Sequence, residues 1–370
     1  MPPAGELRIA RLAEALAKRD VERLIVSAPA NVRYLTGYTG SNGIAVIAAS
    51  GSAAAHKLLT DFRYETQAQK EVGAHAPSCE PVIMTGDLVQ AAGKMLSQER
   101  PQRVGFDEHY LSVARYERLA EALGEGFELI ACGGMVEQLR EVKDEQEVQQ
   151  IAAAAQLADR ALSEILEDGL IGRSERDVAI ALESRMRMLG AQAPSFPSIV
   201  ASGAHGALPH AQPRDQAIQA GTLVTIDWGC VLDGYCSDCT RTYAAGPVSE
   251  RHREIYAIVL AAQLAGLTAV AAGRSGKEVD AVAREVIEAA GYGERFGHGL
   301  GHGVGIEIHE GPRLSKTAGD DPLRVGNVVT VEPGIYLPGD LGVRIEDLVV
   351  VGLDGPRITT SLTKELTVVS

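Results

Sequence analysis

The sequence contains 370 residues, of which 45% are hydrophobic and 23% are charged, and its formal net charge is −14. These values are typical of one large or two ordinary soluble globular domains. The negative charge and the lack of a basic patch argue against a nucleic-acid partner and an anionic membrane. No apolar run approaches the length of a membrane span, and the N-terminus carries interleaved charges instead of a signal-peptide core, so we expect a cytoplasmic location.

The five cysteines are an odd number in a long chain, which makes a disulfide framework a poor interpretation. Cys236 and Cys239 form a single C-x-x-C pair with no second pair. A structural zinc site at this pair is therefore only a minor alternative.

Residues 6 to 130 alternate helical and strand patterns, which indicates an α/β domain with a mixed sheet. The clearest predicted elements are an amphipathic helix at 7–18 and strands at 23–27, 43–48, 81–84 and 103–106. The periodicity breaks at Cys132-Gly133-Gly134. We therefore predict an N-terminal domain at 1–133 and a second domain at 134–370.

The second domain repeats one plan, in which two helices lead into a hairpin. In the first copy, a helix runs to about Glu167, and Ser174 is suited to N-cap the next helix. In the second copy, helices are predicted from Ser249 to about Ala272 and from Ser275 to Ala290. This pseudo-duplication predicts a shared site between the two halves.

The first predicted hairpin turns at Asp233-Gly234, a pair suited to a two-residue type I′ turn. With this turn, Asp227 lies opposite Thr240, and Asp238 points to the same face. Two carboxylates aimed at one place repel each other unless they share a proton or a cation. Two solvated aspartates on an edge hairpin remain the alternative at this stage.

The second predicted hairpin turns around Gly339, which is equidistant from Glu332 and Glu346. An odd-residue loop centred there pairs these two carboxylates across the strands. Between the hairpins, glycines alternate with His298 and His302. This run fits neither a dinucleotide-binding nor a P-loop pattern, and we expect its glycines to allow close approach of the backbone.

Four carboxylates and one or more imidazoles form a ligand set that suits manganese, cobalt, iron(II) or zinc. Two divalent ions would balance the charge better than one, and ions about 3.5 to 4 Å apart can hold a hydroxide for attack on a carbonyl. The sequence contains neither His-Glu-x-x-His nor Gly-x-Ser-x-Gly.

In order and spacing, residues 143 to the C-terminus resemble the pita-bread metallopeptidases, the family of methionine aminopeptidase, aminopeptidase P and prolidase. The resemblance implies an α+β protein with a C-terminal pita-bread (creatinase/aminopeptidase) fold. It also implies two divalent metal ions, with manganese as the first choice and cobalt, zinc or iron(II) as alternatives. The five implied metal ligands are Asp227, Asp238, His302, Glu332 and Glu346. Among them, Asp238 and Glu346 would bridge the ions, and Glu332 would exchange a proton with the nucleophile.

Three histidines match the proline-specific branch of this family: His210, His298 and His309. By resemblance they face the substrate, with catalytic roles for His210 and His309, and His309 could donate to the developing oxyanion. Arg344 resembles the arginine beside the bridging glutamate and would hold a bridging ligand or the substrate's terminus. Residues 31–43 and 60–64 resemble the creatinase-type N-terminal α/β domain of Xaa-Pro peptidases, although Phe62 stands where many relatives carry glycine.

The resemblance implies a peptidase that uses a metal-bridging hydroxide to hydrolyse the Xaa-Pro bond. The substrate would be a proline-containing peptide, either an Xaa-Pro dipeptide (prolidase type) or the N-terminus of a longer peptide (aminopeptidase P type). The alternatives are a non-catalytic pita-bread binding module and a metal-free creatinase-like hydrolase, which retention of all five ligands disfavours. The two-domain resemblance also implies a homodimer.

Overall fold

A computed structural model describes residues 2–99 and 101–370. The chain divides into two compact units, residues 1–140 and 141–370. No helix among the described residues has both the length and the apolar character needed to cross a membrane.

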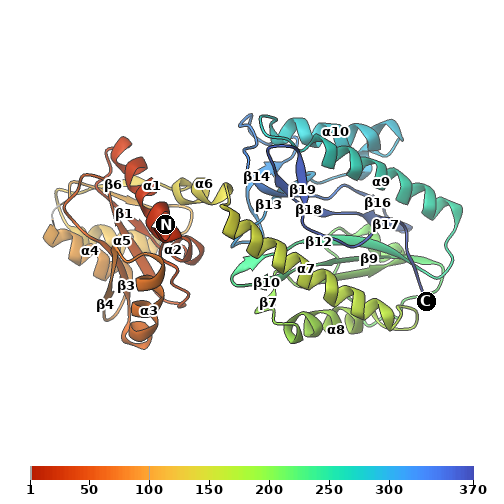
Figure 1. The fold of residues 1–370 in the computed structure, drawn as a ribbon, viewed down its shortest axis with the longest axis horizontal. Coiled ribbons are helices and arrows are strands. Elements are labelled where there is room, and N and C mark those ends of the chain that lie inside the picture. The colour runs from red at the N-terminus through yellow and green to blue at the C-terminus, as the bar shows by residue number, and fades with distance from the viewer. Residues whose placement is uncertain (1, 100) are drawn as a thin grey trace. The chain divides into compact units, whose positions relative to one another are not determined.

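The first unit is an α/β unit built on one six-stranded sheet in the order β4-β3-β2-β1-β5-β6 (Figure 1). Only β2 runs against its neighbours, so the predicted mixed sheet is confirmed. Its strands are β1 (Arg23–Val26), β2 (Gly43–Ala48), β3 (His56–Thr60), β4 (Cys79–Ile83), β5 (Arg103–Phe106) and β6 (Glu128–Ala131). Its helices are α1 (Ala4–Lys18), α2 (Pro29–Thr36), α3 (Glu65–His75), α4 (Leu88–Glu99), α5 (Val113–Leu123) and α6 (Met135–Glu141).

In the second unit, two pairs of helices lie outside the sheets, and each pair precedes a hairpin, as the pseudo-duplication predicts (Figure 1). The helices are α7 (Glu145–Glu167), α8 (Glu175–Met188), α9 (Glu250–Ala269) and α10 (Gly276–Ala289). The Ser174 side chain accepts from the Asp177 amide at the start of α8, so the predicted N-cap is confirmed. Such caps satisfy amides that have no partner within the helix.

The strands of the first half are β7 (Ala193–Pro194), β8 (Ile199–Ser202), β9 (Thr222–Trp228), β10 (Cys230–Leu232), β11 (Tyr235–Cys236) and β12 (Cys239–Ala245). Those of the second half are β13 (Gly301–Gly303), β14 (Glu310–Leu314), β15 (Val328–Val331), β16 (Gly334–Leu337), β17 (Leu341–Arg344), β18 (Asp347–Val351), β19 (Pro356–Ile358) and β20 (Val368–Val369). β20 pairs with β12, so the last strand of the chain joins the first-half sheet.

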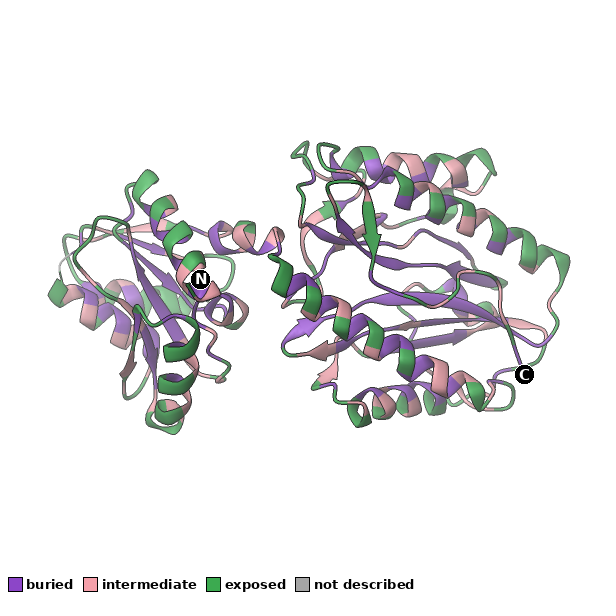
Figure 2. Ribbon diagram, viewed as in Figure 1, coloured by how far each residue is buried: buried purple, intermediate pink, exposed green. Residues whose placement is uncertain are grey.

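The core of the second unit lies between helices and sheets. Figure 2 shows strands that are buried along most of their length and helices that expose one side. One apolar cluster joins α9 and α10 to the second-half strands, and another joins α7 and α8 to β9 and β12. Burial on both faces explains why polar side chains on these strands need partners inside the protein.

Candidate metal centre

The first hairpin has the predicted register. Thr240 pairs with Asp227 in β12 and β9, and Leu232 pairs with Tyr235 beside the turn. Both turn residues, Asp233 and Gly234, have positive φ angles of 47° and 76°, as a type I′ turn requires. The hairpin is nevertheless divided between two sheets. β9 and β12 belong to one sheet, whereas β10 and β11, next to the turn, belong to another, in which β10 pairs with β7.

The second hairpin also has the predicted register. Val331 pairs with Asp347 on one side of the carboxylates, and Gly334 pairs with Arg344 on the other. Both pairs are symmetric about Gly339, so Glu332 and Glu346 lie opposite each other, as predicted. Again the ladder is interrupted at the carboxylates, because β15 and β18 belong to a different sheet from β16 and β17.

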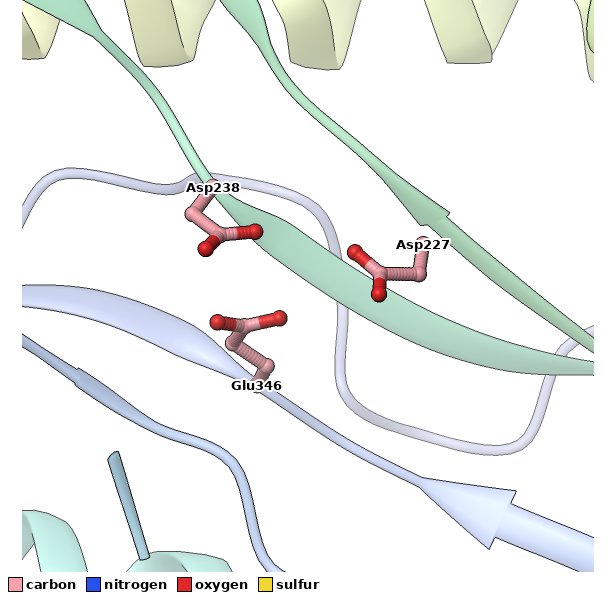
Figure 3. A group of neighbouring side chains, drawn as sticks. All are labelled: Asp227, Asp238 and Glu346. Atoms are coloured by element: carbon pink, nitrogen blue, oxygen red, sulfur yellow. The ribbon is translucent and has the colours of Figure 1, made fainter. Parts of the chain in front are cut away.

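Three carboxylates converge at the junction of the two hairpins. Asp227, Asp238 and Glu346 each offer an oxygen within 4.8 Å of the others, and Figure 3 shows their carboxylates turned toward one another. Burial and the neighbouring Glu346 and Asp227 raise the pKa of Asp238 well above its ordinary value. Burial and the neighbouring Glu332 and Asp227 likewise raise the pKa of Glu346. Without a cation, this arrangement disfavours ionisation of Asp238 and Glu346.

His302 links the three carboxylates to Glu332. Its Nε2 lies 3.5 Å from both Asp238 Oδ2 and Glu332 Oε1. His302 lies in β13, which can run close to β15 because Gly301 has no side chain. A Cβ at this position would collide with the main-chain carbonyl of Thr330. The five predicted ligands therefore lie together in the structure.

The tautomer of His302 suits metal binding. Its Nδ1 lies 3.0 Å from the carbonyl oxygen of Gly303, which can only accept, so Nδ1 carries the proton. Nε2 then presents a lone pair toward Asp238 and Glu332. Burial lowers the pKa of His302, which favours this neutral form.

Unpaired oxygens provide a further test of whether these residues fit a cation. Asp227 Oδ1 and Glu346 Oε1 are buried and have no hydrogen-bond partner, whereas the other oxygen of each carboxylate accepts a bond, from Arg344 Nη2 (2.7 Å) and Thr240 Oγ1 (2.7 Å) respectively. A buried carboxylate oxygen without a partner is costly unless it coordinates a metal. The oxygen-rich set with one imidazole fits divalent metal ions.

Arg344 is buried and contacts the protein on several sides. Its Nε donates to Thr240 Oγ1 (3.0 Å), and its Nη1 donates to Tyr336 Oη (3.0 Å) and the carbonyl of Pro209 (3.2 Å). Tyr336 Oη lies 2.8 Å from His298 Nε2, while His298 Nδ1 lies 2.8 Å from the carbonyl of Gly299. Arg344 therefore directs the Tyr336 hydroxyl proton toward His298, and both ring nitrogens of His298 are engaged within the protein.

His210 and His309 are the more accessible histidines. Both are exposed, and the His309 ring lies edge-on to the His302 ring with the centroids 4.4 Å apart. The His309 ring is only partly desolvated, but this desolvation and the neighbouring His302 lower its pKa, so a neutral ring is favoured. The structure thus places His309 directly beside His302, one of the five predicted ligands.

Contacts of Thr240, Thr330 and Tyr336 with the predicted site residues were not indicated by the sequence. Thr330 Oγ1 donates to Glu332 Oε1 at 3.0 Å, and Thr240 Oγ1 donates to Glu346. The two-residue strand period already placed Thr330 on the face of Glu332 and Thr240 on the face of Asp238. By contrast, no local pattern indicates that Tyr336 reaches Arg344 and His298.

The zinc alternative gains no support. Cys236 and Cys239 are buried, and burial raises the pKa of Cys236 to about 12 and that of Cys239 well above its ordinary value. Each thiol donates to a main-chain carbonyl. Within residues 2–99 and 101–370, no cysteine belongs to a group that could hold a metal ion.

Comparison with known proteins agrees with this geometry. The model of metallopeptidase family M24 matches residues 149–352, and the model of the creatinase/prolidase N-terminal domain matches residues 8–142. The chain belongs to metallopeptidase family M24. It is therefore an enzyme of the metallopeptidase class, with an N-terminal creatinase-like domain and a C-terminal pita-bread domain, and the predicted fold class is confirmed.

Several relatives match over nearly the whole chain. The Xaa-Pro dipeptidase of Pyrococcus furiosus is 36% identical and covers 97% of this chain and 99% of its own. The structure of the Xaa-Pro dipeptidase from Bacillus anthracis superposes with a TM-score of 0.92 at 39% identity, covering 99% of this chain and 100% of its own. The X-Pro aminopeptidase from Thermotoga maritima gives a TM-score of 0.86 at 37% identity, with coverage of 95% and 99%. An M24 protein with these relatives is expected to bind divalent metal ions, for which the carboxylate group supplies ligands.

Proposed function

We propose that this M24 protein is a two-metal peptidase that hydrolyses the peptide bond before proline. The observation that carries the proposal is the convergence of five candidate ligands, in which Asp227 Oδ1 and Glu346 Oε1 have no hydrogen-bond partner and His302 Nε2 faces Asp238 and Glu332. The names of the relatives, two Xaa-Pro dipeptidases and one X-Pro aminopeptidase, supply the substrate class. A non-catalytic binding module is disfavoured because no ligand of the set is missing.

We assign Asp227, Asp238, His302, Glu332 and Glu346 to the two ions. Divalent ions bound there supply a nucleophile at neutral pH, by lowering the pKa of water, and polarise the scissile carbonyl. The four carboxylates carry four negative charges, and Arg344 compensates one of them beside Asp227. These charges sum to +1 with two divalent ions and to −1 with a single ion, so only the two-ion centre would attract a further anion.

Glu332 is suited to accept and return a proton. Burial raises its pKa above the ordinary value, although His298 and Arg344 act in the opposite direction. Thr330 orients Oε1, which leaves Oε2 available for a proton. A carboxylate with a raised pKa is a better base near neutral pH than an ordinary glutamate.

His309 and His210 are the proposed substrate contacts. His309 stands beside His302, where its neutral ring can donate to the carbonyl oxygen as negative charge develops. His210 follows Pro209, whose carbonyl accepts from Arg344, so the loop that carries His210 is tied to the ligand set. His298 and Arg344 keep their proposed substrate roles, but their engagement with Tyr336 means that a substrate would have to displace this contact or act through it.

The test combines metal analysis with peptide kinetics. Purified protein should bind two equivalents of Mn²⁺ and should hydrolyse Ala-Pro or Ala-Pro-Ala, while Ala-Ala and Ala-Ala-Ala serve as matched controls. Faster hydrolysis of the dipeptide would assign the prolidase type, and faster hydrolysis of the tripeptide the aminopeptidase P type. A protein that binds no divalent ion and is not activated by Mn²⁺, Co²⁺, Zn²⁺ or Fe²⁺ would contradict the proposal.

We further propose that manganese is the working metal, that the protein is a homodimer and that it acts in the cytoplasm. Five free, buried cysteines suit a reducing compartment. Light scattering that gives only the monomer mass at micromolar concentration would contradict the dimer. Metal reconstitution series would rank manganese against cobalt, zinc and iron.

A further inference from the structure

Behind the carboxylates, a buried arginine lies on the opposite face of the same strand. Arg241 is in β12 between Thr240 and Thr242, and only 1% of it is exposed. Because side chains alternate along a strand, Arg241 points away from the face that carries Asp238 and Thr240. Its guanidinium therefore cannot touch a metal or a substrate at the centre.

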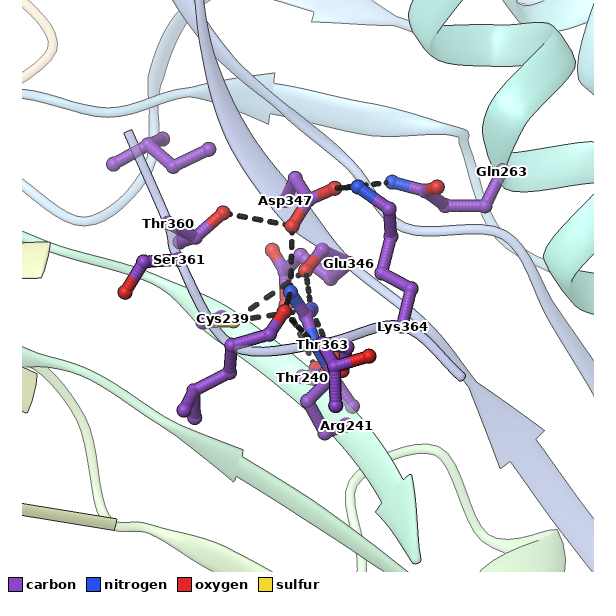
Figure 4. Close-up of polar contacts among 12 residues, drawn as sticks. Cys239, Thr240, Arg241, Gln263, Glu346, Asp347, Thr360, Ser361, Thr363 and Lys364 are labelled. Atoms are coloured by element: carbon purple, nitrogen blue, oxygen red, sulfur yellow. Dashed lines mark hydrogen bonds and ion pairs between the residues drawn. The ribbon is translucent and has the colours of Figure 1, made fainter. Parts of the chain in front are cut away.

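The Arg241 guanidinium is a multiple donor to main-chain oxygens. Nη1 donates to the carbonyls of Thr240 (3.0 Å) and Glu346, Nη2 to that of Leu362 (2.7 Å), and Nε to that of Thr363 (3.1 Å) (Figure 4). One planar fork thus joins β12, the residue before β18 and the segment near the C-terminus. Only arginine has enough donors in a fixed geometry for this set.

Asp347 holds the Arg241 guanidinium in place. Its Oδ1 accepts from Arg241 Nη2 (2.8 Å) and Thr360 Oγ1 (2.7 Å), and its Oδ2 accepts from Lys364 Nζ (2.7 Å) and Gln263 Nε2 (2.8 Å) (Figure 4). Asp347 is fully buried, and these four donors come from three parts of the chain, which are β12, α9 and the 360–364 segment. The ion pair between Arg241 and Asp347 therefore joins β12 to β18 and is itself held by several further contacts.

The main chain of Glu346 depends on this arrangement. The hairpin ladder is interrupted at Glu346, whose amide instead donates to the Thr240 carbonyl (3.0 Å), while its own carbonyl accepts from Arg241 and from Cys239 Sγ (3.4 Å). Both backbone groups of Glu346 are thus held by β12, the strand that begins just after Asp238. These bonds connect the main chain of Glu346 to the strand that directly follows Asp238.

We propose that Arg241 is a positioning residue that fixes the separation of Asp238 and Glu346 and thereby allows both carboxylates to serve the same two metal ions. This inference rests on the proposed two-metal centre. Residues beyond the ligands themselves commonly change metal affinity by 10- to 100-fold when mutated. In this proposal, Arg241 acts through the main chain of Glu346. The 360–364 segment contributes indirectly, because Thr360 and Lys364 bind Asp347, which in turn binds Arg241.

The test is Arg241→Lys, which keeps a positive charge but cannot reach all these carbonyls. We expect the affinity for the second Mn²⁺, measured by chelator competition, to fall about 10- to 100-fold. The coupled two-manganese signal in electron paramagnetic resonance should weaken at full metal loading. Leu182→Ala is the control, because it removes a fully buried side chain of α8 and lowers stability without touching the ligands.

The outcomes separate the two proposals. If Arg241→Lys binds both ions and gives the coupled signal like Leu182→Ala, the positioning role is wrong, while the two-metal peptidase stands. If wild-type protein binds no ions, the proposed function itself fails. Should Arg241→Lys not fold, Lys364→Met provides the second test, because Lys364 is partly exposed and touches only Asp347 in this network. It should show a smaller loss of second-ion affinity, and unchanged affinity would overturn the inference.

Discussion

Glu346 and Asp347 are adjacent in the sequence and both are buried, yet they lie in opposite electrostatic environments. Glu346 faces three other carboxylates of the proposed centre, and burial together with Glu332 and Asp227 raises its pKa. Burial also acts to raise the pKa of Asp347, but Arg241 and Lys364 outweigh it and lower that pKa below the ordinary value. The negative charge of Asp347 is balanced by Arg241 and Lys364, whereas the surroundings of Glu346 are dominated by other carboxylates, which favours a bound cation.

This contrast distinguishes a structural ion-pair network from a binding site without reference to any relative. Burial alone is common to both regions and cannot tell them apart. The decisive difference is whether fixed protein cations and donors satisfy the buried oxygens. All four contacts of Asp347 come from the protein, whereas Asp227 and Glu346 each leave one oxygen without a partner.

The largest effect should follow from Asp238→Asn. This change removes a negative charge that both ions would share, so metal retention and turnover should be lost together. We expect a fall in metal affinity that exceeds the roughly 100-fold seen for residues outside the ligand set. Metal content after dialysis and kcat on Ala-Pro measure it, and a variant that retains two ions with normal kcat would show that Asp238 is not a ligand.

Asp347→Asn should mainly affect stability. It leaves the buried Arg241 without its counter-charge, which costs about 3–5 kcal/mol when one partner of a buried ion pair is removed. Chemical denaturation of the metal-free protein measures this change. Asp238→Asn, in the same metal-free protein, should be neutral or stabilising, because it relieves repulsion among carboxylates. Equal destabilisation by the two variants would remove the distinction between the regions.

His309→Ala should reduce kcat by about 10² to 10³ if His309 donates to the oxyanion. The ions should remain bound, because His309 lies beside His302 but is not in the assigned ligand set. Steady-state kinetics together with metal analysis check both points. A normal kcat with only a raised KM would make His309 a simple binding residue, because an oxyanion donor acts mainly on the transition state.

A smaller effect concerns pH. The pKa of Asp238 is raised in the folded protein, so the folded state holds this proton more tightly than the unfolded chain does. Ionisation of Asp238 therefore destabilises the folded protein. This destabilisation increases as pH rises from about 4 toward the folded pKa, by at most about 1.4 kcal/mol per pH unit. In metal-free protein, the stability of Asp238→Asn relative to wild type should increase between pH 5 and pH 8.

The comparison with Asp238→Asn cancels the contribution of the histidines, whose lowered pKa values act in the opposite direction below about pH 6.5. Saturating Mn²⁺ should reverse the sign of the difference, because the ionised carboxylate then binds the cation. Parallel denaturation curves of the two proteins at all pH values would show that the folded pKa of Asp238 is not raised.

Much of the local structure follows from the sequence. The two-residue strand period, the Asp233-Gly234 turn and the symmetric position of Gly339 were sufficient to predict the register of both hairpins. The predicted ranges of β2 and β5 were also correct. By contrast, β3 was not predicted, because its first residues, His56 and Lys57, are polar and only its place between β2 and β4 makes it a strand. The boundary at residue 133 stays a prediction, and a helix, α6, follows it directly.

By itself, the sequence determined which carboxylates share a face within each hairpin, because register is a local property of a turn and its two strands. Resemblance to a family then joined the two pairs and His302 into one ligand set. Only the tertiary structure decided how the hairpins meet, that Arg241 and Asp347 hold Glu346 from behind, and that Tyr336 links Arg344 to His298. These contacts join residues up to about one hundred positions apart, and their geometry depends on how helices and sheets pack, which no local period encodes.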